Sequence, residues 1–116
     1  MLINLLKSKI HRAVVTEANL NYAGSISIDA TLMEAANLSE FENVHILNIT
    51  NGERLITYAI KAPKNSGQVC VNGAAAHLAG RGDIIIVVSY CFIHKNEVTN
   101  HAPAIVHVNE QNKIAR

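Results

Sequence analysis

The stretch NYAGSISID, residues 21–29, places a tyrosine and two small residues directly before a run that alternates serine with isoleucine. Alternation with a period of two is typical of a β-strand with one apolar face. A strand that begins at Gly24-Ser25 has two interpretations. The pair is an ordinary turn, or the Gly24–Ser25 peptide bond is itself a reaction site.

Short strand-like segments lie on both sides of this stretch. Strands are predicted, from β-branched composition and alternation, for residues 9–16, 25–29, 43–50, 53–60, 68–72, 84–93 and 104–110. One helix is predicted for residues 29–38, with Asp29 or Thr31 as its N-cap and Asn37 as its C-terminal stop. Asn51-Gly52 between two of the strands is a strong hairpin signal. Many short strands with little helix predict a β-barrel or a sandwich, and the pattern does not choose between them.

Composition indicates a single domain spanning residues 1–116, because 49% of the chain is hydrophobic and can form a core at this length. The net charge of +1, with three tyrosines, two phenylalanines and no tryptophan, argues against nucleic-acid binding. The longest apolar stretch, residues 84–93, covers about half of a membrane span. No signal peptide is recognisable at the N-terminus, and the two cysteines lack a CxxC spacing. We therefore expect a soluble cytoplasmic protein with two buried thiols.

Several kinds of site find little support in the motifs. The six histidines show no metal-binding spacing, so no metal site is predicted. The serine of AGSIS is not in a G-x-S-x-G elbow. The small residues 73–76 leave backbone N–H groups uncovered, which suits either an anion site or a close-packed turn, and composition favours neither. In a regular strand Arg54 and Tyr58 share one face, while Thr57 points to the other.

Taken together, three stretches resemble the pyruvoyl-dependent aspartate decarboxylase family: SKIHRAVVTEANLNYAGSISID at 8–29, NITNGERLITYAI at 48–60 and VNGAAAHLAGRGDIIIVVSY at 71–90. The resemblance runs from about residue 1 to about residue 103. One departure is Asn37, where the family usually has glycine. The resemblance implies a mainly β fold, a double-psi β-barrel with short helices, that assembles as a homotetramer.

The resemblance also implies that the chain cleaves itself between Gly24 and Ser25, giving a β chain of residues 1–24 and an α chain of residues 25–116. The Ser25 hydroxyl would attack the Gly24 carbonyl, and elimination and hydrolysis would leave a pyruvoyl group, the covalent cofactor, at residue 25. Glycine suits the attacked position because it lacks a Cβ and tolerates a strained backbone. Whether cleavage needs a maturation partner is left open.

The implied reaction is decarboxylation of L-aspartate to β-alanine for pantothenate biosynthesis, through a Schiff base on the pyruvoyl group. Tyr58 matches the proton donor, and Thr57 matches the residue that assists cleavage. The resemblance assigns substrate binding to Lys9, His11, Arg54, Thr57, Asn72, Gly73, Ala74 and Ala75. Among these, Arg54 suits the side-chain carboxylate of aspartate because its guanidinium is planar and bidentate.

Two other functions remain as alternatives: a pyruvoyl decarboxylase of another amino acid, and a non-catalytic oligomeric β-barrel interaction module. A structural question is also open, since Thr57 points away from Arg54 and Tyr58. Either a bulge turns the strand between residues 56 and 58, or the site lies between subunits and opposite faces of the strand serve different sites. We expect the second arrangement.

Overall fold

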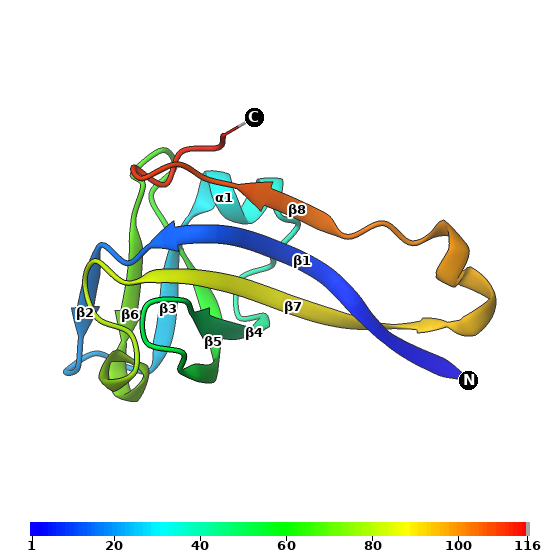
Figure 1. The fold of residues 1–116 in the computed structure, drawn as a ribbon, viewed down its shortest axis with the longest axis horizontal. Coiled ribbons are helices and arrows are strands. Elements are labelled where there is room, and N and C mark those ends of the chain that lie inside the picture. Colours follow the sequence, from blue (N-terminus) through cyan, green and yellow to red (C-terminus); the bar gives the residue numbers. More distant parts are fainter. Residues whose placement is uncertain (116) are drawn as a thin grey trace.

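Strands dominate residues 1–115, which are the residues that the computed structural model describes (Figure 1). The strands are β1 (Leu2–Val14), β2 (Glu17–Asn19), β3 (Ser25–Asp29), β4 (Asn43–Asn48), β5 (Arg54–Ala62), β6 (Val69–Asn72), β7 (Ile84–His94) and β8 (Ala104–His107). The helices are α1 (Ala30–Ala35) and two short 3-10 helices, η1 (Gly73–His77) and η2 (Lys95–Asn100). The predicted mainly β class with short helices is confirmed.

All eight strands join in one sheet with the order β2-β6-β3-β5-β4-β7-β1-β8. Strand β5 connects its two halves, because residues 54–58 pair antiparallel with β4 and residues 59–62 pair parallel with β3. Figure 1 shows β1 and β7 running across β3 and β6, and the buried side chains of these strands meet between them in the core. Thr16 N–H also donates to Val69 O at 2.8 Å beside the β2–β6 pair, and the one continuous sheet is consistent with the predicted barrel.

Strand β1 is longer than predicted. It pairs with β7 from Leu2 opposite His94 to Val14 opposite Ile84, and the end of this pair that carries the N-terminus extends away from β2, β3 and β6 (Figure 1). The register shifts twice, once between Leu6 and Ser8 and once between His11 and Ala13. Each extra residue breaks the period-two alternation, which is why the pattern predicted a strand only from residue 9.

The turn signals in the sequence were read correctly. Asp29, not Thr31, is the N-cap of α1, and its carboxylate accepts from Thr31 N–H. Asn37 follows the helix with φ of 58°, the left-handed conformation that ends helices and that asparagine tolerates. The β4–β5 hairpin turns at Asn51-Gly52, with Gly52 at φ of 79°.

Asp29 does more than cap the helix. Its two carboxylate oxygens also accept from the backbone N–H groups of Asn65 and Gly67, each at 2.9 Å. Burial by itself raises the pKa of this carboxyl, but the hydrogen bonds from Gly67, Thr31 and Asn65 outweigh it and hold the pKa below its ordinary value. The carboxylate therefore ties the end of β3 to the loop before β6.

We expect Asp29→Asn to lower the free energy of unfolding by about 1–3 kcal/mol, because an amide cannot accept from all three donors. A depressed carboxyl pKa stabilises the fold fully above the unfolded pKa of about 3.9, and that stability is lost as pH falls through the lower folded value. Denaturant unfolding at several pH values should therefore show a shallower acid slope in Asp29→Asn than in the parent. Glu34→Gln, at an exposed helix position paired only with Lys64, is the control, and equal acid slopes in parent and Asp29→Asn would contradict the assignment.

Candidate active site

Ser25 is the first residue of β3 and is 1% exposed. The strand lies between two neighbours: Ile26 to Asp29 pair with Ala59 to Ala62 of β5, and Ser25 to Ile28 pair with Asn72 to Val69 of β6. Gly24 precedes the strand and belongs to no ladder. The sheet therefore holds Ser25 rigidly while the peptide bond before it lies at the free end of the strand.

The Ser25 hydroxyl is bonded to Asn72, the residue directly opposite it on β6. Asn72 Nδ2 donates to Ser25 Oγ at 3.0 Å, and Ser25 Oγ lies 3.4 Å from the carbonyl oxygen of Ala23. Side chains of directly opposed residues in an antiparallel pair point to the same face. The contact between Ser25 and Asn72 thus follows from their register.

Asn72 also contacts two residues that the sequence analysis did not select. Its Nδ2 donates to Ser27 Oγ at 3.1 Å, and its Oδ1 accepts from Cys70 Sγ at 3.1 Å. The alternation of SISI placed Ser27 on the face of Ser25, so this contact was accessible from the pattern. Cys70 was not, because the pairing of β3 with β6 carries no local signal.

Gly73 brings η1 against the backbone at Gly24. Its φ is 69°, and a Cβ built on it would lie 2.7 Å from Gly24 Cα and 2.9 Å from Tyr22 O. Gly24 itself has no left-handed φ, and a Cβ there would face open space. The open space at Gly24 fits the expectation that no Cβ blocks an approach to it, and its φ shows no left-handed strain. Glycine is required at residue 73, because the backbone there has a positive φ and packs closely onto the predicted cleavage segment.

A cavity of about 420 Å³ opens beside Gly24. Its lining residues are Gly24, Leu55, Ile56, Thr57, Tyr58, Ala74, Ala75 and Leu78. A cavity of this size suits a small metabolite. Five residues predicted for the site, namely Gly24, Thr57, Tyr58, Ala74 and Ala75, therefore surround one space within a single chain.

Strand β5 is regular along this cavity. Its pairing with β4 continues from Tyr58 opposite Asn43 to Arg54 opposite Leu47 without a register shift, so the bulge alternative is wrong. Pairing with β3 begins only at Ala59, so residues 55–58 present a free edge toward Gly24. Side chains from both faces of a strand can border a space at its edge, which explains why Thr57 and Tyr58 line the same cavity.

Three predicted charged residues lie elsewhere in the chain. Arg54 borders a separate hollow of about 240 Å³ with His45 and Tyr90. Lys9 and His11 are on β1, and the sheet order places β5, β4 and β7 between that strand and β3. Burial, followed by the charges of Lys9, His107 and Arg12, lowers the pKa of His11. None of these three residues borders the cavity beside Gly24, although Lys61 lines a separate cavity with Ser27, Cys70 and Asn72.

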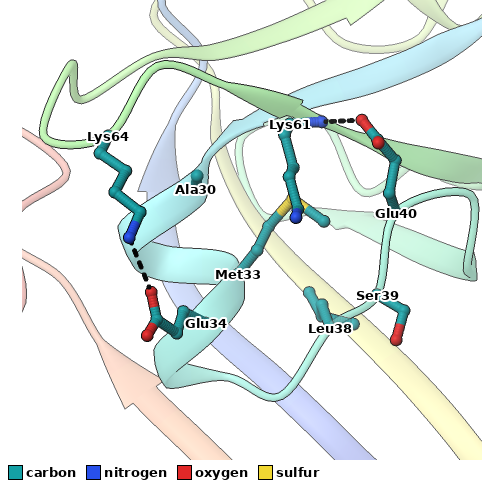
Figure 2. Close-up of a pocket in the computed structure, with 8 residues that line it drawn as sticks. All are labelled: Ala30, Met33, Glu34, Leu38, Ser39, Glu40, Lys61 and Lys64. Carbon is teal, nitrogen blue, oxygen red and sulfur yellow. Dashed lines mark hydrogen bonds and ion pairs between the residues drawn. The ribbon is translucent and has the colours of Figure 1, made fainter.

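A further cavity, of about 370 Å³, lies beside α1 at the opposite end of β3 (Figure 2). The lysines in Figure 2 contact nearby carboxylates: Lys64 Nζ lies 3.4 Å from Glu34, and the backbone N–H of Lys61 donates to Glu40 at 3.0 Å. None of the predicted site residues borders this space. It plays no part in the chemistry considered below.

Residues 1–115 carry neither a metal-binding cluster nor a membrane-spanning helix. That part of the chain contains no group of three or more His, Cys, Asp or Glu side chains placed to hold a metal ion. It also contains no helix long and apolar enough to cross a membrane.

Comparison with known proteins gives a consistent result. A model of the aspartate decarboxylase family matches residues 1–115. Over 116 residues the chain is 58% identical to the aspartate 1-decarboxylase of Caldicellulosiruptor bescii, covering 100% of this chain and 91% of that protein. It is 59% identical over 114 residues to the aspartate 1-decarboxylase of Campylobacter fetus, covering 98% of each. The aspartate 1-decarboxylase of Clostridium botulinum is 51% identical over 116 residues, which is 100% of this chain and 91% of that protein.

Gly73→Ala should lower the free energy of unfolding by more than the ordinary cost of placing alanine at a positive φ. The added Cβ would also clash with the backbone around Gly24. Gly52→Ala is the matched control, because Gly52 also has a positive φ but open space where a Cβ would lie. We expect alanine to cost about 1 kcal/mol at residue 52 and roughly 2–4 kcal/mol at residue 73, where a backbone clash adds to the strain. Thermal unfolding of the two variants measures the difference, and equal losses would show that Gly24 and Gly73 are not in close contact.

Proposed function

The chain belongs to the aspartate decarboxylase family, and from this premise we propose that it decarboxylates L-aspartate to β-alanine through a pyruvoyl group made from Ser25. Family membership makes the chain a carboxy-lyase. The observation that carries the proposal is the position of Ser25, with its hydroxyl bonded to Asn72 and the preceding Gly24 open to a cavity that Thr57 and Tyr58 line. We further propose that the β-alanine feeds pantothenate biosynthesis in the cytoplasm.

Formation of the pyruvoyl group begins, in this proposal, with attack of Ser25 Oγ on the Gly24 carbonyl carbon. The Oγ–C bond forms, the Gly24–Ser25 C–N bond breaks, and the hydroxyl proton moves to the Ser25 nitrogen, so the amide becomes an ester. Loss of the Ser25 Cα proton then breaks the Cβ–Oγ bond, leaves Gly24 with a free carboxylate and residue 25 as dehydroalanine. Water hydrolyses dehydroalanine to the ketone and ammonia. Thr57, on the cavity beside Gly24, is the residue we assign to stabilising the oxyanion of the first step.

The same geometry explains why Ser25 and not Ser27 is the reacting residue. Both hydroxyls share the amide of Asn72. Ile26, which precedes Ser27, is paired with β5 on one side and with β6 on the other, so its peptide group is held inside the sheet. Gly24 belongs to no ladder, and its carbonyl carbon is free to change geometry during attack.

The residues around Ser25 fit a carbonyl cofactor at that position. When present, the pyruvoyl group supplies a ketone that binds the amine of aspartate and withdraws electrons from the Cα–carboxylate bond. Tyr58 lines the cavity, and its phenol O–H is the donor we assign to protonating the carbon that loses CO₂. Asn72, Gly73, Ala74 and Ala75 are the residues we assign to holding the substrate next to residue 25.

The residues for the two carboxylates of aspartate, the cations Arg54 and Lys9 together with the imidazole of His11, are assigned to neighbouring subunits. Arg54 faces outward on β5 and lies outside the Gly24 cavity of its own chain. Large apolar side chains are exposed nearby, with Ile56 66% and Phe92 70% exposed, as expected for a surface that another copy covers. We therefore propose a homotetramer in which Arg54, Lys9 and His11 of one subunit complete the site around Ser25 of another.

Ser25→Ala should leave one intact chain and no decarboxylase activity, because alanine has neither the nucleophile nor the leaving oxygen. A denaturing gel and a β-alanine assay provide the measurement. Ser39→Ala, at an exposed loop serine, is the control and should cleave normally. Two fragments from the Ser25→Ala chain would refute the cleavage site, and a parent chain that stays intact after long incubation would favour the non-catalytic interaction module.

Mixed oligomers test the shared site. Arg54→Ala should cost roughly 2–5 kcal/mol of interaction with the substrate carboxylate, so Arg54→Ala and Ser25→Ala oligomers should each be nearly inactive. Co-assembled tetramers should recover activity, because some sites would pair Ser25 of an Arg54→Ala chain with Arg54 of a Ser25→Ala chain. No recovery in verified mixed tetramers, with the Arg54→Ala chains cleaved, would place both residues of a working site on one chain.

A further inference from the structure

The nitrogen and the oxygen of the Asn72 carboxamide both have hydrogen-bond partners in the uncleaved chain. Its two N–H groups serve Ser25 Oγ and Ser27 Oγ, and its oxygen accepts from Cys70. All four side chains are buried. They share one face because Ser25 is opposite Asn72 and Ser27 is opposite Cys70 in the antiparallel pair of β3 and β6.

The orientation of this amide matters because an amide turned by 180° exchanges a donor for an acceptor. Hydroxyl groups can accept either orientation, since they both donate and accept. The partner that favours one orientation is Cys70, because its S–H donates to the amide oxygen while its sulfur is only a weak acceptor for the N–H of a turned amide. Burial and the charge of Glu17 raise the pKa of the Cys70 thiol, so it keeps the proton that it donates.

There is also room for the amide to turn. Ser27, Cys70 and Asn72 border a cavity of about 360 Å³ that Glu17 and Tyr22 also line, and a cavity of this size with polar walls holds water. An amide that lost its protein partners would exchange them for water and sample both orientations. The orientation seen at Ser25 therefore depends on Cys70, and the hydrogen bond to Ser27 anchors the amide beside it.

We propose that Cys70 and Ser27 are positioning residues that hold the Asn72 amide with Nδ2 toward Ser25 Oγ during cleavage. This role rests on the proposed function. When the Ser25 Cβ–Oγ bond breaks, the electron pair moves onto Oγ, which departs as part of the Gly24 carboxylate. An N–H group that already points at Oγ stabilises that developing charge without reorganisation. A turned amide would place its oxygen there and oppose the step.

The test is the rate constant of chain cleavage in freshly purified parent and variant chains, followed by intact mass. Cys70→Ala should slow cleavage about five-fold or more, as expected for the loss of one orienting hydrogen bond. Ser27→Ala should also slow it. Cys70→Ser keeps a donor at nearly the same place, but its hydroxyl also accepts, so its cleavage rate should fall between those of the parent and Cys70→Ala. Cys91→Ala, at the other cysteine on β7, is the control and should match the parent.

Thermal unfolding of each variant shows whether slower cleavage comes from a less stable fold or from a change in amide orientation. The decisive comparison is between the cleavage rate constants of Cys70→Ser and Cys70→Ala. Equal slowing in both would show that packing of the sulfur, not donation, matters and would overturn the role. So would parent-like cleavage in folded Cys70→Ala and Ser27→Ala. If Cys70→Ala does not fold, Cys70→Ser decides alone, and parent-like cleavage in it would overturn the role. A parent that never cleaves overturns the proposed function and this role with it.

Discussion

The pairing of β3 with β6, with Ser25 opposite Asn72, is the contact on which the rest of the site depends. It places the serine hydroxyl against the amide, and it begins at Ser25, directly after Gly24, so that the proposed cleavage bond lies at the end of the sheet. Other features hold this register in place. Asp29 binds the loop that leads into β6, and Asn112, which is buried near the C-terminus, bonds Gly67 in the same loop and the backbone of Val14 at the end of β1.

Local structure was predictable wherever a single residue type determines it. Asp29 and Asn37 at the ends of α1 and Asn51-Gly52 in the hairpin have short-range causes, so the sequence reveals them. The long β1 strand was only partly predictable, because bulges at Lys7 and Arg12 interrupt its alternation. The parallel pairing of β1 with β8 was not predictable, since parallel pairing joins segments far apart in the chain and leaves no local signal.

The candidate site, like the fold, could be predicted only in part from the sequence. The resemblance selected Gly24, Ser25, Thr57, Tyr58 and Asn72, and the structure brings them together at the start of β3 and the free edge of β5. It does not bring Lys9, His11 or Arg54 to them. Period-two alternation already placed Arg54 and Thr57 on opposite faces, and the regular register of β5 bears this out. A site split in this way agrees with an enzyme whose reacting group belongs to one subunit and whose substrate-binding cations belong to another.

The central claim is that the Gly24–Ser25 bond is converted into a free carboxylate and a pyruvoyl group. The most direct measurement is the intact mass of the fragment that begins at residue 25. The account predicts a mass lower by one ammonia molecule than that of the same fragment beginning with serine, together with a second fragment that ends at Gly24. A fragment with the mass of an N-terminal serine would indicate ordinary hydrolysis and contradict the account.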